Sequence, residues 1–140
     1  MRLEITRRSD LAIRALKELD ERGVTVKAAD LAVATNSTNG FLPHVMAPLV
    51  KAGWVTSDPG RNGGYRLEVP TSTISVLDVI EAVEGSLPAD VCVLRHGPCQ
   101  ADGPCSLHAA WSHARTSLLD TLAATAVGAQ IPGGTYDHDR

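Results

Sequence analysis

The sequence predicts a mainly α-helical protein with one small β-hairpin, arranged as a winged helix-turn-helix followed by a long C-terminal dimerisation helix. Three observations support this fold class. Two short helical patterns flank a turn, two short strand patterns follow directly, and a long amphipathic pattern lies near the end of the chain. We therefore expect a winged helix-turn-helix domain at 1–86, a cysteine-rich loop at 87–106, the long helix at 107–127 and a flexible tail at 128–140.

Length and composition limit the class of protein. The 140 residues suffice for one domain with a small appendage. The start is charged without a signal-peptide core, and no apolar run approaches the roughly 20 residues that cross a bilayer. We therefore expect a cytoplasmic protein with no membrane partner and with reduced thiols. Residues 1–66 hold ten Lys and Arg against seven Asp and Glu, so this half is the candidate nucleic-acid surface.

The first helix is expected at residues 9–22, with Ser9 as its N-cap and Gly23 as its stop. The helix-turn-helix follows as a short helix at 28–35, a turn at 36–40 and a second helix at 41–53. Pro43 is acceptable near the start of the second helix. Pro48 should bend or shorten that helix, because its ring clashes with the preceding turn.

The wing is expected from strands at 54–57 and 65–69, joined by a Gly- and Pro-rich tip. At this tip Arg61 would reach a minor groove or a phosphate, and Gly63 and Gly64 would let the backbone approach DNA closely. The alternative is an ordinary hairpin that needs glycine for positive φ. The order of the elements favours the wing.

The long helix after the globular part has little of its own chain left to cover its apolar stripe, which comprises Trp111, Ala114, Leu118, Leu119 and Leu122. We expect this stripe to be buried against a second copy in a homodimer, with packing onto its own domain as the alternative. A further helix is expected from the capping-box pair Ser75 and Asp78 to Gly85.

The cysteine-rich loop contains all three cysteines of the protein, Cys92, Cys99 and Cys105, with His108 just after the last. A Gly-Pro pair precedes both Cys99 and Cys105, which indicates a folded-back loop. Such a loop favours an iron–sulfur cluster, while a structural zinc ion and buried core cysteines are the alternatives. No nucleophile–base–acid set is present, so we do not expect an enzyme.

Several stretches together resemble a known family. They are Met1-Arg-Leu3, Asp10-Leu-Ala-Ile-Arg14, Leu49-Val-Lys-Ala-Gly-Trp-Val55, the wing Gly60-Arg-Asn-Gly-Gly-Tyr-Arg-Leu67, the run Ile74-Ser-Val-Leu-Asp-Val-Ile-Glu-Ala-Val-Glu-Gly85, and the cysteine loop followed by Ser-Leu-His108-Ala-Ala-Trp111. To about residue 125 the chain resembles the winged-helix iron–sulfur regulators of the Rrf-two family, which includes IscR, NsrR and RirA.

This resemblance implies a homodimeric transcription regulator, repressor or activator, that binds a double-stranded DNA operator. Cys92, Cys99 and Cys105 would hold the iron–sulfur cluster. His108 as fourth ligand implies a [2Fe–2S] cluster, which we favour; Asp10 from the partner subunit implies a [4Fe–4S] cluster, and His96 is a third candidate. Helix-dipole complementarity is the alternative role for Asp10.

The same resemblance places a recognition helix at about residues 39–52 in the major groove and the wing in the minor groove. Asn39 and His44 are the best candidates for base contacts, because their side chains can pair with base edges. The full set of DNA-contact candidates is Arg2, Arg7, Arg8, Thr38, Asn39, His44, Lys51, Arg61, Asn62, Gly63 and Tyr65.

Overall fold

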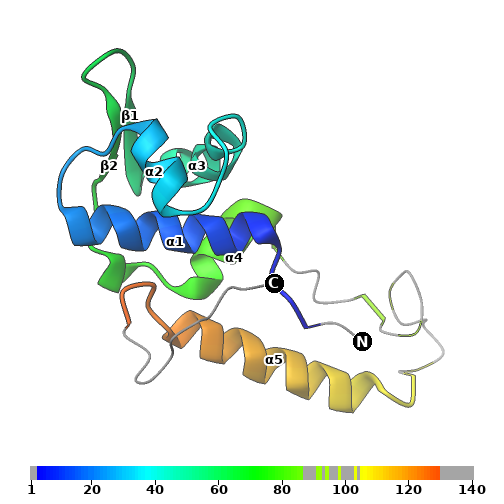
Figure 1. Cartoon of the computed structure of the whole chain (residues 1–140). Coiled ribbons are helices and arrows are strands. Elements are labelled where there is room, and N and C mark those ends of the chain that lie inside the picture. The colour runs from blue at the N-terminus through cyan, green and yellow to red at the C-terminus, as the bar shows by residue number, and fades with distance from the viewer. Residues whose placement is uncertain are drawn as a thin grey trace.

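A computed structural model of the chain confirms the predicted fold class (Figure 1). The structure describes residues 3–86, 91, 92, 94, 98, 103 and 105–129. Within them the elements follow in the order α1 (Arg7–Arg22), α2 (Ala28–Ala34), α3 (Leu42–Lys51), β1 (Val55–Asp58), β2 (Gly64–Leu67), the 3-10 turn η1 (Thr71–Thr73), α4 (Val76–Glu84) and α5 (His108–Ala124).

Helix α1 begins two residues before its predicted start, because Thr6 caps it and Ser9 does not. The Thr6 hydroxyl accepts the Ser9 N–H at 3.2 Å, which satisfies one of the unpaired donors of the first turn. Ser9 is instead buried inside the first turn. The predicted stop is confirmed: Gly23 has φ 63° and its N–H donates to the Leu19 carbonyl at 3.0 Å.

One continuous core lies between the first four helices and the hairpin. The apolar face of α1 packs against α2, α3, α4 and β2. Burial of a large aliphatic side chain contributes roughly 1.5–3 kcal/mol, so this face stabilises the whole domain. The large side chains that are fully buried include Leu16, Leu19, Leu31, Leu42, Val45, Met46, Leu49, Val55, Ile74, Val79 and Val127.

Helix α3 continues through Pro48 and ends at Lys51, two residues before the predicted stop at Gly53. Pro43 occupies the first turn, where a missing N–H costs no hydrogen bond. Pro48 lies in the interior and cannot donate to the carbonyl four residues earlier, that of His44.

The wing is a two-stranded antiparallel hairpin in which Val55 pairs with Leu67 and Asp58 with Gly64. An isolated bridge to the segment before α2 anchors the hairpin: the N–H groups of Val26 and Tyr65 each donate to the other residue's carbonyl at 2.8 Å. Gly64 has φ +152°, and a Cβ there would lie 2.2 Å from the Val26 carbonyl oxygen.

The structure of the hairpin itself explains why residues 63 and 64 are both glycine. A Cβ on Gly63 would lie 2.0 Å from the Asp58 carbonyl oxygen, so any side chain would break the turn. The requirement for glycine here follows from backbone packing inside the hairpin, whatever the DNA contact.

Helix α5 lies apart from the core, below the winged part in Figure 1, and has no fully buried residue. Its C-terminal end is nevertheless fixed to the start of α4. The Val76 N–H donates to the Thr125 carbonyl, and the Val127 N–H donates to the Ile74 carbonyl, each at 2.8 Å. Val127 enters the core at 1% exposure.

The predicted capping box at the start of α4 is confirmed by both of its hydrogen bonds.

None of the helices in the part of the chain that the structure describes has the length and apolar character needed to span a membrane.

Candidate nucleic-acid interface and cysteine site

The turn before α3 and its first turn carry exposed side chains that can read DNA. Asn39 lies in the turn and His44 is the third residue of α3, and both are exposed. Thr38 accepts the Phe41 N–H on its hydroxyl at 3.1 Å and thereby fixes the start of the helix. The ring of Phe41 lies 6.3 Å from that of His44. The N-terminal part of a recognition helix is where base edges are contacted.

Phe41 is exposed next to His44, and our sequence reasoning does not include it among the DNA-contact candidates. Its place between a turn and a helix start is the signal that points to it, because the residue is 37% exposed there beside a predicted base contact. Lys51 is exposed at the opposite end of α3.

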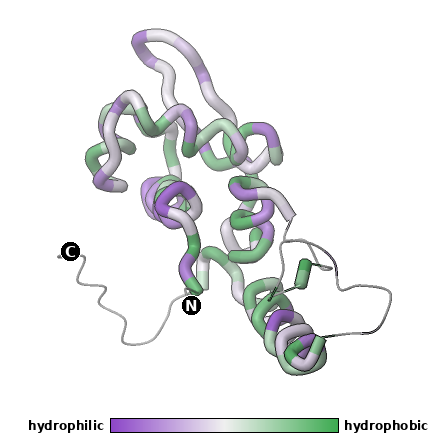
Figure 2. Tube along the Cα trace, turned by 90° about the vertical axis from the view of Figure 1, so that its right-hand side faces the viewer, coloured by the Kyte–Doolittle hydropathy of each residue, from purple (hydrophilic) through white to green (hydrophobic). Residues whose placement is uncertain are grey.

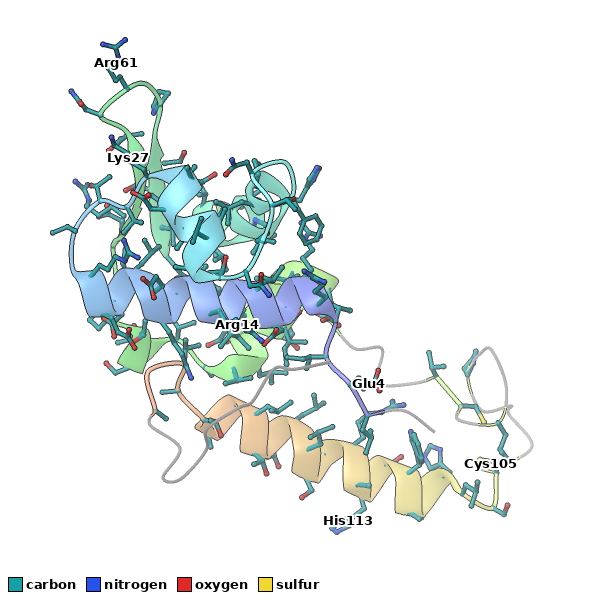
Figure 3. All side chains as sticks on the ribbon, viewed as in Figure 1. Glu4, Arg14, Lys27, Arg61, Cys105 and His113 are labelled. Atoms are coloured by element: carbon teal, nitrogen blue, oxygen red, sulfur yellow. The ribbon has the colours of Figure 1, made fainter. Side chains whose placement is uncertain are left out.

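The wing tip presents a cation on a hydrophilic turn. Arg61 points away from the domain at the tip (Figure 3), and the tip itself is neutral to hydrophilic in Figure 2. Asn62 beside it is also exposed. Arg61 makes no hydrogen bond or ion pair with residues the structure describes, so its charge is available to a phosphate.

The strands of the wing hold other polar groups within the hairpin. Glu68 accepts hydrogen bonds from the Thr56 hydroxyl at 2.7 Å and from Arg66 Nε at 3.0 Å, and these bonds lower its pKa. Arg66 is thereby bound to Glu68. Tyr65, a predicted DNA contact, is half-buried against the core, and this burial raises its pKa.

The basic start of α1 divides into two kinds of arginine. Arg7 is exposed, whereas the Arg8 guanidinium donates to the His44 carbonyl from Nε at 2.9 Å and from Nη2 at 2.7 Å. Arg8 therefore binds α3 of its own chain. Arg2 lies outside the described residues.

Two of the three cysteines come together at the start of α5. The Sγ atoms of Cys92 and Cys105 lie 3.7 Å apart, far beyond the disulfide bond length of about 2.05 Å. Two thiolates bound tetrahedrally to one metal ion at about 2.3 Å would have their sulfurs about 3.8 Å apart. This pair therefore fits two ligands of a single metal ion, iron or zinc.

The loop that carries the cysteines folds back as predicted. Val91 and Pro98 form an antiparallel bridge, and Arg115 of α5 donates to the Val91 carbonyl at 3.4 Å. Cys99 and His96 lie outside the described residues. Among the residues that are described, no three His, Cys, Asp or Glu side chains form a metal-holding group.

The two candidates for the fourth ligand have different surroundings. His108 is the first residue of α5, and its N–H donates to the Cys105 carbonyl at 3.0 Å, so it lies one turn from a cysteine. Asp10 lies on α1, where Arg14 binds both carboxylate oxygens, with Nε at 3.2 Å from Oδ1 and Nη2 at 2.9 Å from Oδ2. Asp10 would have to leave Arg14 to bind a metal ion.

Glu84, the last residue of α4, joins α4 to the start of α1 through hydrogen bonds that were not predicted from the sequence. Its Oε1 accepts the Thr6 N–H at 3.0 Å, the Thr6 hydroxyl at 2.6 Å and the Ser9 hydroxyl. Burial raises the pKa of this carboxyl, but these hydrogen bonds outweigh it and hold the pKa below its usual value. No sequence spacing marks the contact, because its partners lie more than 70 residues away.

The two candidate sites lie at opposite ends of the molecule. Arg61 marks the wing end and Cys105 marks the cysteine end in Figure 3, with α1 between them. A recognition helix and a cationic wing on a helix-turn-helix frame define a winged-helix DNA-binding protein.

Comparison with known proteins identifies the family. The Rrf2 family model, described as an iron-dependent transcriptional regulator, matches residues 5–130. The chain is 32% identical to the HTH-type transcriptional regulator IscR of Vibrio vulnificus over 122 residues, which cover 86% of this chain and 72% of that protein. The chain belongs to the Rrf2 family of transcriptional regulators.

Solved structures share the fold. CymR, the global cysteine regulator of B. subtilis, matches with a TM-score of 0.73 and 23% identity over 90% of this chain and 94% of that one. IscR of T. potens matches with a TM-score of 0.67 and 24% identity over 89% and 83% of the two chains. The named relatives regulate transcription, which fits the prediction that this chain is not an enzyme.

Replacing Glu84 by glutamine should reduce the loss of unfolding free energy that the protein shows as the pH falls from 7 to 3. The folded-state pKa lies below the unfolded value of about 4.3, so the carboxylate stabilises the fold above that pH and loses this effect as pH falls through the folded pKa. Urea unfolding between pH 3 and 7 should therefore show Glu84→Gln less stable than wild type at pH 7, with the gap closing in acid. Parallel curves would contradict this assignment.

Proposed function

We propose that this protein is a homodimeric transcription regulator whose operator binding is controlled by an iron–sulfur cluster that senses redox state, nitric oxide or iron–sulfur supply. The observation that carries the proposal is the pair of cysteine sulfurs 3.7 Å apart at the start of α5. The family description, iron-dependent transcriptional regulator, supports iron as the metal. An operator as partner implies that the protein works in the cytoplasm.

We infer that Cys92, Cys99 and Cys105 supply three thiolates and that His108 supplies the fourth ligand of a [2Fe–2S] cluster. His108 is favoured because it follows Cys105 by one turn, whereas the Asp10 carboxylate is bound to Arg14. Asp10 from the partner subunit, with a [4Fe–4S] cluster, is the second possibility. When bound, the cluster would supply a redox- and nitric-oxide-reactive centre between the winged domain and α5.

A structural zinc ion in a module that binds proteins is the alternative function. The sulfur separation fits zinc as well as iron, because zinc–thiolate bonds also measure about 2.3 Å. Membership in a family of transcriptional regulators favours the DNA-binding function.

Anaerobically purified wild-type protein should be coloured and contain about equal amounts of iron and sulfide, with little zinc. Cys105→Ser should lose most of both, because it removes one sulfur of the close pair, while the neighbouring Ser106→Ala should keep them. Absorbance spectra with iron, sulfide and zinc assays test this. The iron count per chain distinguishes the two cluster types, and a colourless protein with stoichiometric zinc would support the alternative.

The dimer rests on α5. Leu118 is 44% exposed and Trp111, Leu119 and Leu122 are half-buried, so the apolar stripe is incompletely covered by this chain. A second copy that packs α5 against α5 would cover the stripe and place the two winged domains as a twofold pair. Two recognition helices so arranged would read half-sites about 34 Å apart.

Leu118→Glu should convert the dimer to a monomer, because it puts a charge into the middle of the stripe. Thr116→Glu is the matched control, since residue 116 is exposed on another face of α5 and should leave the dimer intact. Sedimentation equilibrium measures the mass of both variants. A dimeric Leu118→Glu protein would rule out this interface.

In the complex, α3 would lie in the major groove, where Asn39 and His44 approach base edges, and the wing would approach the minor groove with Arg61. Loss of the thiolate ligation would release the cysteine loop from α5 and change the spacing of the two recognition helices. This coupling fails if the protein with and without its cluster binds the same operator equally.

Arg61→Ala should weaken operator binding several-fold and reduce the salt slope of log Kd by about 1, as expected for one lost phosphate contact. Arg66→Ala is the control from the same hairpin, because the Arg66 guanidinium is bound to Glu68. Fluorescence anisotropy titrations at several salt concentrations measure both slopes. An unchanged slope in Arg61→Ala would exclude the wing tip from the DNA contact.

A further inference from the structure

The interior proline of the recognition helix leaves a backbone acceptor for another element to use. In an α-helix each carbonyl accepts the N–H four residues later, and residue 48 is a proline that has none. The carbonyl concerned is that of His44, whose side chain is exposed and is a predicted base contact. Arg8 of α1 supplies the missing donors, with Nε at 2.9 Å and Nη2 at 2.7 Å from this oxygen.

The same guanidinium also contacts the end of α4. Arg8 Nη1 lies 3.4 Å from the Val83 carbonyl oxygen in the last turn of α4. The next residue, Glu84, binds Thr6 and Ser9 on either side of Arg8 in the sequence. The first turn of α1 is therefore fastened to the last turn of α4 at two points.

The last turn of α4 is also where the cysteine loop begins. After Glu84 the chain continues through Gly85 and Ser86 toward Cys92, so the last turn of α4 adjoins the cysteine-rich segment in the sequence. Figure 1 shows the start of α1, the end of α4 and the described loop residues on one side of the molecule. One side chain thus joins the root of the cysteine loop to the first turn of the recognition helix.

We propose that Arg8 is the positioning residue through which the state of the cysteine loop sets the pose of α3 on DNA. The inference rests on the proposed function, because it assumes a cluster-dependent operator affinity. A guanidinium suits the role because its five N–H groups are fixed in one plane, and three of them here reach carbonyls of two different helices. A lysine ammonium keeps the charge but lacks this rigid fork.

The first experiment compares a variant that loses the guanidinium group of Arg8 with a variant that loses a neighbouring positive charge. Arg8→Lys keeps the charge and loses the fork, whereas Arg7→Ala loses a neighbouring exposed charge and keeps the fork. Anisotropy titrations use a DNA duplex selected from a random library by the wild-type protein, with cluster-loaded and cluster-free protein. The readout is the ratio of the two Kd values, which for allosteric coupling is typically about 5–150-fold.

Arg8→Lys should reduce this ratio to within about twofold of 1, while Arg7→Ala should weaken both forms alike and keep the wild-type ratio. If Arg8→Lys retains the wild-type ratio, Arg8 is only a phosphate contact or a surface cation, and the proposal is overturned. A wild-type protein that has no cluster, or whose Kd ratio is 1, would instead refute the proposed function, and the coupling role would be lost with it.

The second experiment separates positioning from stability by measuring two quantities: the urea midpoint of the metal-free protein and the Kd ratio defined above. Arg8→Ala should lower the urea midpoint of the metal-free protein, because the His44 carbonyl loses its donors. Adding Pro48→Ala restores an N–H at residue 48, so the double variant should regain the midpoint relative to Arg8→Ala but not the Kd ratio. Recovery of both would mean that Arg8 acts on stability alone, and recovery of neither would overturn the assignment of the His44 carbonyl.

Discussion

The structure depends on the burial of one face of α1. This helix touches α2, α3, α4, η1 and β2, and its side chains at Leu11, Leu16 and Leu19 are almost fully enclosed by them. Helices α3 and α4 pack on α1 and also touch each other, so the three helices form one close-packed unit. A close-packed core transmits displacement instead of absorbing it. The candidate DNA-contact helix α3 is therefore packed against both α1 and α4.

Helix α5 stands outside this constraint. It has no fully buried residue, and the segment that follows it enters the core at Val127 through hydrogen bonds to the start of α4. Its other end carries His108 and lies beside Cys105. An element held at one end by the core and lying beside a thiol pair at the other is suited to link the proposed metal centre with the proposed dimer interface.

The polar contacts at the start of α1 connect these two parts. Glu84 holds the cap of α1, and Arg8 joins the end of α4 to the His44 carbonyl. Hydrogen bonds to charged groups contribute about 1.5–3 kcal/mol where solvent is excluded and less at a partly exposed site such as this one. Contacts of this size are strong enough to orient a helix and weak enough to be rearranged by the ligand change that we propose for the cysteine loop.

The sequence by itself determined the class of fold and the order of the helices and strands. These follow from local chemistry: apolar periodicity for the helices, a capping box at Ser75 and Asp78, and a Gly-rich turn between two strands. The error at the start of α1 was local too: Ser is the better N-cap by residue type, but packing buries Ser9 and leaves Thr6 as the cap.

Tertiary structure alone decided which polar groups meet. From the sequence, Pro48 was expected to bend or shorten α3, because it cannot donate to the His44 carbonyl. The donor that satisfies this carbonyl is Arg8, which lies 36 residues away on α1 and could not be identified from the local sequence. The approach of the Cys92 and Cys105 sulfurs to 3.7 Å, and the placement of Glu84 against Thr6, likewise depend on how α1, α4 and α5 are packed. A sequence pattern records what neighbours along the chain require, whereas these contacts join residues that only the folded core brings together.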